Sequence, residues 1–172
     1  GRKSLFLPTG AAMHSVTRSI FVADYNRRIH VFNEEGVYQY RFLVSASPPS
    51  HGLLPNSLCI NGSADEVYVT TIDIAGVAVF STTGEFRRWI GDLVSPSSIA
   101  LHPLTGEVVV AEARNHRVLV LAPRGGRLRS FGRGGSGVDQ LCSPCGVCIH
   151  PVTGHVFIAD KDNHRVVVLP SI

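Results

Sequence analysis

The apolar positions along this chain come in short runs that are bounded by turn residues. In the third quarter of the chain, the runs are Ser98 to His102, Glu107 to Glu112, Arg117 to Leu121 and Arg127 to Phe131. The residues between them are rich in Gly, Pro and polar side chains, which favour tight turns. Runs of five or six residues rich in valine are typical of strands, and none shows the 3.6-residue period of an apolar helix face. The pattern predicts four short antiparallel strands, here called a to d in chain order, and no helix.

This four-strand pattern occurs four times. A proline before strand a recurs at spacings of 47, 41 and 48 residues, at Pro8, Pro55, Pro96 and Pro144. The residue that ends strand b recurs at the same spacings, at Asp24, Thr71, Glu112 and Asp160. A four-stranded meander repeated at this period is typical of a β-propeller blade. The sequence therefore predicts an all-β, single propeller domain over residues 1–172, with blades at about 8–47, 53–91, 94–132 and 141–172.

The strand compositions agree with radial stacking of the blades. Strands b and c are almost wholly apolar, as expected where neighbours cover both faces of a sheet, whereas strand d alternates like an outer edge. The fourth repeat reaches only strand c. Residues 1–6 resemble 126–131 and could supply its outer strand, which would close a small ring; alternatively, the chain is a partial arc of a larger propeller. An arc would leave apolar faces exposed, so we expect a partner, a homo-oligomer or additional blades to cover them.

The fourth repeat resembles an NHL repeat. It reads Val-Phe-Ile-Ala-Asp over 156–160, followed by Asn163, His164 and Arg165. The third repeat differs mainly in having Glu112 for the aspartate, and the first has a b–c loop one residue shorter. The second departs most, because Thr71 and Gly76 replace the acidic residue and the arginine. The resemblance covers nearly the whole chain and implies a β-propeller, usually of five or six blades in that family.

The same resemblance suggests kinds of function. NHL propellers serve as substrate-recognition ends of tripartite-motif ubiquitin ligases and as extracellular sensors of bacterial kinases. Several of the tripartite-motif propellers bind RNA through a basic rim. The fold is a scaffold with many uses, so the resemblance alone does not select among them.

Composition adds little to this choice. Of the 172 residues, 44% are apolar and 17% charged, which is typical of a globular protein, and the net charge of +3 permits but does not demand an acidic partner. No apolar run approaches 18 residues, so we expect no contact with a membrane interior. The chain shows neither a signal peptide nor a disulfide framework, and we therefore expect a cytoplasmic location.

The b–c loops carry the first candidate binding residues. An acidic residue ends strand b and an arginine begins strand c across the loop, so the two could form an ion pair that fixes the loop. Alternatively, the loops share one rim of the propeller, and their basic side chains bind phosphate or acidic groups of a partner. The candidate partner-binding residues of this rim are Arg27, Arg28, His116, Arg117, His164 and Arg165.

The most basic stretch of the chain supplies a second candidate surface. Arginines and glycines are concentrated over residues 124–135, at the end of the third blade and the start of the link to the fourth, a composition that also occurs in RNA-binding segments. Phe131 is the only aromatic residue within it, so base stacking has little support, and a solvated turn with an outer strand is the alternative. The candidate partner-binding residues here are Arg124, Arg127, Arg129 and Arg133.

Repeated histidines and cysteines raise the question of a metal. His14, His102 and His150 share the end of strand a with Asn61, and the turn sequences after them favour a polar side chain that bonds the turn backbone over a zinc ligand. Cys59 and Cys148 align with alanines, and Cys145 with small residues, so we interpret these cysteines as packing residues. Only Cys142 has no counterpart. We predict no metal and no other cofactor.

No catalytic motif is present. The chain lacks a nucleophile elbow, a phosphate-binding Gly-Lys-Ser/Thr loop and a His-Glu-x-x-His sequence. We therefore expect a non-enzymatic scaffold that binds a protein partner within a larger protein or complex. The alternatives are an RNA-binding NHL domain with a basic rim and, third, a metal-dependent lyase or hydrolase propeller.

Overall fold

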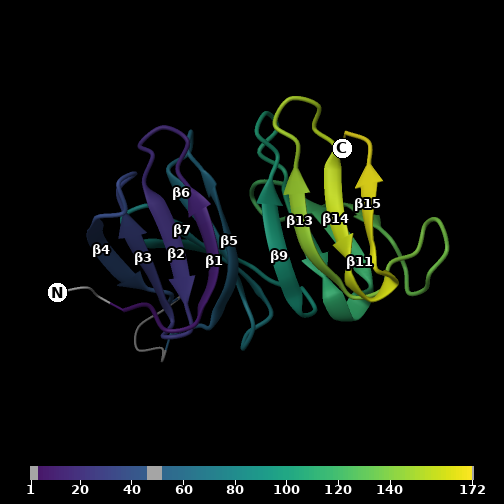
Figure 1. Ribbon diagram of the computed structural model, residues 1–172, viewed down its shortest axis with the longest axis horizontal. Coiled ribbons are helices and arrows are strands. Elements are labelled where there is room, and N and C mark those ends of the chain that lie inside the picture. Colours follow the sequence, from purple (N-terminus) through teal and green to yellow (C-terminus); the bar gives the residue numbers. More distant parts are fainter. Residues whose placement is uncertain (1–3, 46–51, 172) are drawn as a thin grey trace. The chain divides into compact units, whose positions relative to one another are not determined.

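The structure, a computed structural model, describes residues 4–45 and 52–171. The described part is built from strands and two three-residue 3-10 turns, η1 (Ala113–Asn115) and η2 (Lys161–Asn163) (Figure 1). Each sheet is an antiparallel meander whose strands lie side by side in chain order. The predicted all-β blade architecture is confirmed.

Four blades follow one another along the chain. Blade one holds β1 (Pro8–Met13), β2 (Ile20–Asp24), β3 (Arg28–Phe32) and β4 (Tyr38–Leu43). Blade two holds β5 (Pro55–Asn61), β6 (Glu66–Thr71), β7 (Gly76–Ser81) and β8 (Phe86–Ile90). Blade three holds β9 (Pro96–Leu101), β10 (Val108–Glu112), β11 (Arg117–Leu121) and β12 (Arg127–Phe131). Blade four holds β13 (Pro144–Ile149), β14 (Val156–Asp160) and β15 (Arg165–Leu169).

The chain divides into two compact units, Gly1–Ile90 with blades one and two and Gly91–Ile172 with blades three and four. We call them unit 1 and unit 2. Of the possible outer strand over residues 1–6, residues 1–3 lie outside the described part, and residues 4–6 are not in a strand. In the described residues blade four is therefore three-stranded, with the order β13-β14-β15.

Within unit 1, β5 packs against β1 and β2, so that the two blades share one apolar core. Blade one contributes Phe21 and Ile29, blade two contributes Val69 and Phe80, and all four are fully or almost fully buried. At the edge of this interface the Thr9 hydroxyl donates a hydrogen bond to the Pro55 carbonyl oxygen at 3.0 Å. Burial of apolar surface between blades is the main stabilising term, because an isolated meander leaves both of its faces uncovered.

Unit 2 repeats the same arrangement. Here β13 packs against β9 and β10, and the core joins Val109 and Val120 of blade three to Val156 and Ile158 of blade four. The Ser97 hydroxyl donates to the Pro144 carbonyl oxygen at 2.9 Å, as Thr9 does in unit 1. The small polar residue after the proline therefore links successive blades in both units.

Blade two shows why its repeat departs from the others. Gly76 stands where the third and fourth repeats have an arginine. A Cβ atom on it would lie 2.2 Å from the Trp89 ring and 2.8 Å from the Ile90 carbonyl oxygen. The large side chain of Trp89 on β8 occupies the space beside strand c, so only glycine fits at this position.

Candidate functional site

The b–c loop of blade four is built around a buried carboxylate. Asp160, at the end of β14, is fully buried and accepts hydrogen bonds from the Cys142 backbone N–H at 2.6 Å, Asn163 Nδ2 at 2.8 Å and Arg165 Nε at 2.8 Å. Burial raises the pKa of this carboxyl, but the Cys142, Asn163 and Arg165 donors outweigh it and lower the pKa below its ordinary value. The guanidinium of Arg165 also donates to the carbonyl oxygens of Ser136, Gly137 and Gln140.

Blade three uses the same arrangement. Glu112 is fully buried and accepts from Arg117 Nε at 2.5 Å, from Asn115 Nδ2 at 3.1 Å and from the Val94 backbone N–H at 2.5 Å. The expected ion pair across the b–c loop is thus present in blades three and four. The sequence did not reveal that each carboxylate also binds the backbone of the segment that precedes its own blade.

Blade one departs from this pattern. Among the described residues, Asp24 forms no ion pair with Arg28, so that expectation is wrong here; its carboxylate instead lies 2.9 Å from His30 Nε2, with both side chains buried. The physical reason is that His30 faces Asp24 from strand c, where the matching residues of blades three and four are Leu119 and Val167. An imidazole is therefore available in blade one alone.

Arg27 connects the b–c loops of blades one and two. Its guanidinium donates to Asp73 Oδ2 at 2.7 Å and also to the Gly52 carbonyl oxygen. Asp73 accepts the Leu54 backbone N–H at 3.0 Å as well. Burial raises the pKa of Asp73, but the Leu54 N–H and Arg27 outweigh it, and the net pKa is lowered. The two loops therefore form one continuous edge of unit 1.

The histidines of the predicted rim take structural positions. His116 and His164 both adopt left-handed backbone conformations, with φ of 52° and 53°, at the ends of η1 and η2. His116 Nδ1 accepts the Ser143 backbone N–H at 3.0 Å, whereas His164 is exposed.

Three of the predicted rim arginines are engaged by carboxylates and carbonyl oxygens of this chain, as described above. They are Arg27, Arg117 and Arg165.

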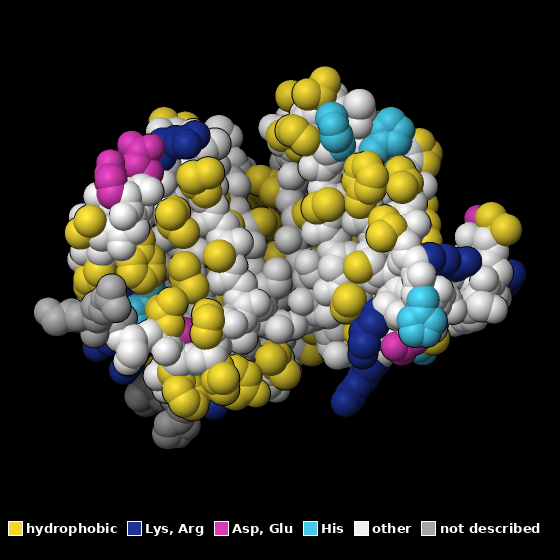
Figure 2. Space-filling view, viewed as in Figure 1, with side chains coloured by type: hydrophobic (Ala, Val, Ile, Leu, Met, Phe, Trp, Pro, Cys, Tyr) yellow, Lys and Arg dark blue, Asp and Glu magenta, His cyan; other side chains and the backbone are white. Residues whose placement is uncertain are grey.

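Apolar side chains are exposed along the b–c edge of unit 1. Tyr25 is 42% exposed, Ile72 48% and Ile74 57%. The Tyr25 backbone N–H bonds the carbonyl oxygens of Phe6 and Leu7, whose side chains are exposed too. Because the Arg27–Asp73 ion pair joins the two loops, these side chains lie on one edge. Figure 2 shows hydrophobic side chains gathered at the lower end of this unit, where β2 ends. None of these residues was among the binding residues predicted from the sequence.

The arginines of the basic segment lie on or beside the outer strand of blade three. Arg129 forms an ion pair with Glu107 at 3.0 Å, and Arg127 donates to the Asp92 carbonyl oxygen. Arg124 and Arg133 are exposed on either side of β12. The strand is a solvated edge that presents positive charge, partly compensated by Glu107.

The repeated histidines at the end of strand a stabilise the a–b turns, as the sequence predicted. In each of three blades the Nδ1 atom accepts two backbone N–H groups of the turn, at 3.1–3.3 Å; these histidines are His14, His102 and His150. Asn61 takes this role in blade two, where its side-chain oxygen accepts the Ala64 N–H at 3.2 Å. Among the residues that the structure describes, no His, Cys, Asp and Glu side chains are grouped as a metal site would require.

A buried polar cluster in blade two was not anticipated. Glu66 accepts both terminal nitrogens of Arg88 at 2.5 and 2.9 Å and the Tyr68 hydroxyl at 2.8 Å. The Arg88 hydrogen bonds lower the pKa of Glu66 to about 2, against an opposing effect of burial, and burial together with Glu66 raises the pKa of Tyr68 to about 12. Tyr68 and Arg88 both lie opposite Val79 across neighbouring strands. An alignment of the strands in register could therefore have found the pair.

The cysteines only partly meet the packing expectation. All four thiols are free, and burial raises the pKa of the Cys59 thiol. Cys145 and Cys148 are exposed, so for them the prediction of a packed position is wrong. Cys148 lies opposite Phe157 on the face of blade four that does not contribute to the core of unit 2.

The two units contain no helix that could serve as a membrane span, as far as the described ranges go.

Comparison with known proteins agrees with the repeat analysis. The family described as NHL repeat matches residues 141–169. The protein called brain tumor, from Drosophila melanogaster, is 26% identical over 132 residues, which cover 73% of this chain but only 12% of that protein. A chain in the crystal structure of a nidogen/laminin complex is 20% identical, with a TM-score of 0.77 over 99% of this chain and 62% of the other. The last likeness concerns the fold alone.

Proposed function

We propose that this chain, an NHL-repeat β-propeller protein, is a non-enzymatic scaffold that binds a protein partner through the b–c edge of unit 1. The observation that carries the proposal is the set of exposed apolar side chains along this edge, with Tyr25, Ile72 and Ile74 at its centre. Contiguous exposed apolar groups with a polar rim are typical of protein interfaces, and a tyrosine is a frequent anchor in them.

The engagement of the loop arginines supports a protein rather than a nucleic acid at this edge. Binding of RNA requires cationic groups that are free to contact successive phosphates, and bases stack on aromatic rings. On this edge, Arg27 is held by Asp73 and Gly52.

A further observation supports a non-enzymatic role. Within the described residues, the b–c carboxylates and the a–b histidines are engaged with their own loops, which supports a role in structure rather than in catalysis.

RNA binding is the second candidate, and a different surface favours it. The outer strand β12 and its flanks present Arg124, Arg127, Arg129 and Arg133 to solvent. Their positive charge is suited to phosphate contacts, although Arg129 would have to exchange its ion pair with Glu107.

The proposal is tested by quantitative affinity capture on three forms of the chain: wild type, Ile74→Arg and Val16→Arg. Both substitutions place a charge on an exposed apolar residue of unit 1, but Val16 lies in an a–b turn outside the b–c edge. We expect Ile74→Arg to lose the captured protein and Val16→Arg to retain it. Equal capture by both variants would contradict the proposed edge.

A parallel titration separates the two candidate ligands. Fluorescence anisotropy of a labelled single-stranded RNA pool is measured at low and near-physiological salt. We expect little change with wild-type protein. Binding that weakens steeply with salt, and that is lost when Arg127, Arg129 and Arg133 are replaced by alanine, would instead support the RNA candidate.

A further inference from the structure

We propose that Arg124, in the c–d turn of blade three, is a site of methylation by an arginine methyltransferase that uses S-adenosylmethionine. The inference goes beyond the proposed binding function and does not depend on which ligand the chain binds. It concerns a turn within unit 2.

The first observation is a triplet that occurs on both sides of β12. Arg-Gly-Gly stands at 124–126, before the strand, and again at 133–135, after it. An enzyme that methylates arginine must enclose the guanidinium in a narrow pocket, which brings the backbone of its substrate close to the surface of the enzyme. Glycine neighbours permit this approach because they lack a side chain and adopt a wide range of backbone conformations. Both arginines therefore have the local sequence of a methylation site.

The backbone of the first triplet forms the tip of the c–d turn. The Ala122 N–H donates to the Gly126 carbonyl oxygen at 2.7 Å, and the Gly125 N–H donates to the Ala122 carbonyl oxygen at 2.8 Å. A Cβ atom on Gly126 would meet no described atom within 4 Å apart from its chain neighbours. The φ of Gly125 is 108°, a conformation that glycine adopts without strain. The backbone beside Arg124 is therefore open to the approach of an enzyme.

The side chain of Arg124 is free as well. It is exposed, and within the described ranges of the chain its guanidinium has no hydrogen-bond or ion-pair partner. The next arginines are engaged, because Arg127 donates to the Asp92 carbonyl oxygen. Arg129 forms an ion pair with Glu107. Arg124 can therefore enter the pocket of an enzyme without breaking a contact of its own chain.

The second triplet is held in a closed loop. The Leu141 N–H donates to the Arg133 carbonyl oxygen at 2.9 Å, and the Gly135 N–H donates to the Leu141 carbonyl oxygen at 3.2 Å. Asn163 Nδ2 donates to the Gly135 carbonyl oxygen at 2.9 Å. A Cβ atom on Gly135 would lie 2.3 Å from the Gln140 side chain. The glycines of this triplet thus serve the packing of the loop and do not leave its backbone open.

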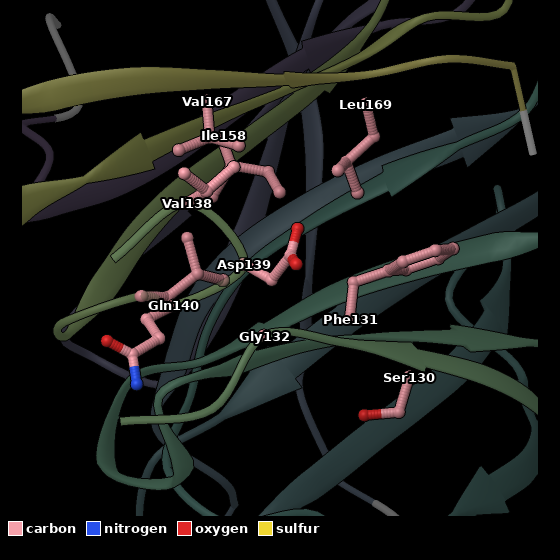
Figure 3. A pocket seen from close by; sticks show the side chains of 10 residues that line it. Ser130, Phe131, Gly132, Val138, Asp139, Gln140, Ile158, Val167 and Leu169 are labelled. Carbon is pink, nitrogen blue, oxygen red and sulfur yellow. The ribbon is translucent and has the colours of Figure 1, made fainter. Parts of the chain in front are cut away.

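The loop of the second triplet also lies beside blade four. Val138 lines a pocket beside β15 together with Ile158 and Val167 (Figure 3). An enzyme could approach the backbone around Arg133 only after this loop had opened, and local opening lowers the fraction of molecules that can react. Arg133 is therefore an internal control for Arg124, with the same local sequence in a different structural setting.

The reaction is a methyl transfer. A carboxylate of the enzyme accepts a proton from the Arg124 guanidinium, and a terminal nitrogen of that group forms a bond to the methyl carbon of S-adenosylmethionine. The bond from this carbon to the sulfonium sulfur breaks, its electron pair remains on sulfur, and S-adenosylhomocysteine is released. The product guanidinium keeps its positive charge, but each methyl group replaces an N–H donor. Methylation therefore weakens paired hydrogen bonds from Arg124 to anionic groups and leaves the net charge of the chain unchanged.

The test incubates the 172-residue chain with S-adenosylmethionine and a purified arginine methyltransferase that forms asymmetric dimethylarginine. Digestion with chymotrypsin, which cleaves after Leu128 and Phe131, places the two arginines in different fragments, and mass spectrometry measures the methyl groups on each. We expect Arg124 to be methylated and Arg133 to react at least about tenfold more slowly, because the loop must open first. A synthetic peptide of residues 120–137 has no closed loop, so both of its arginines should react at similar rates.

Two variants locate the modification in the folded chain. Arg124→Lys should remove most of the incorporated methyl groups, whereas Arg133→Lys should leave their amount nearly unchanged. Thermal unfolding of the methylated wild type should match that of the unmodified chain, because the Arg124 guanidinium stabilises no contact in the described structure.

Three results would overturn the proposal. They are a folded chain without methylation at Arg124, a peptide that is not methylated there, and equal rates at Arg124 and Arg133 in the folded chain. The Ile74→Arg variant separates this proposal from the first, since it should lose partner capture at the b–c edge and be methylated like the wild type.

Discussion

Replacement of Asp160 by asparagine tests whether the buried loop carboxylates hold the blades in place. Asp160 accepts three hydrogen bonds, and its partner Arg165 is 32% exposed. In the Asp160→Asn variant the amide oxygen can still accept one of these bonds. The amide nitrogen, however, would lie beside one of the remaining hydrogen-bond donors and could not accept from it. The negative charge opposite Arg165 is also lost.

The expected loss of unfolding free energy follows from the burial of the Asp160–Arg165 ion pair. Removal of one partner from a buried ion pair costs roughly 3–5 kcal/mol, and the partial exposure of Arg165 places this case near the lower end, at about 3 kcal/mol. In a domain of this size that corresponds to a fall in Tm of roughly 6–12 °C. Differential scanning calorimetry and urea unfolding measure both quantities.

Asp162→Asn is the matched control. It makes the same chemical change two residues away, where the side chain is 46% exposed and 3.8 Å from Lys161. Exposed ion pairs of this kind contribute at most about 1 kcal/mol to stability, so we expect a negligible shift in Tm. If the two variants unfold alike, the buried carboxylate does not stabilise the loop as argued.

The pH dependence provides a second check on the same residue. The pKa of Asp160 is lowered in the folded state, so the folded state binds its proton less readily than the unfolded chain does. Its contribution is fully present above the unfolded pKa and is lost as the pH falls through the folded pKa. The difference in unfolding free energy between wild type and Asp160→Asn should therefore be constant near neutral pH and shrink in strong acid. A difference that grows in acid would refute the assignment.

Three further substitutions test other parts of the fold by urea unfolding. His102→Ala should cost about 1–3 kcal/mol, because it leaves two turn N–H groups without their acceptor, whereas His102→Asn should recover much of this loss, since Asn61 serves the same turn in blade two. Glu66→Gln should cost about 3 kcal/mol at neutral pH; because the pKa of Glu66 is lowered to about 2, this difference should persist above pH 4.5 and vanish only toward pH 2. Gly76→Ala should destabilise by about 1–3 kcal/mol, as the new methyl group meets the Trp89 ring; a neutral result would show that the indole moves at little cost.

The candidate site was only partly predictable from the sequence. The roles of the a–b histidines followed from their alignment with Asn61 before a turn, because such side chains bond nearby backbone wherever the fold places them. The loop ion pairs could be predicted from the sequence for blades three and four, because a hairpin brings the end of strand b to the start of strand c. The exception at Asp24 depends on His30, a residue of strand c whose reach toward the carboxylate could not be read from the loop alone.

Other features required contacts between segments far apart in the chain. The engagement of Arg27 by Asp73 joins residues 46 positions apart, and the exposed apolar edge becomes visible only once that contact sets the two loops together. The pocket beside β15 likewise depends on Phe131 and Leu169, which belong to different blades. Sequence spacing carries no information on such distances.

The blade architecture followed from the sequence alone, because strand periodicity, turn chemistry and the four-fold repeat are local properties of the chain. The position of each loop within its blade followed from it as well. Which charged groups form ion pairs, and which apolar side chains stay exposed, became known from the packed structure. These properties depend on the packing of one blade against the next, where burial and hydrogen-bond partners are set by residues that the linear pattern keeps apart.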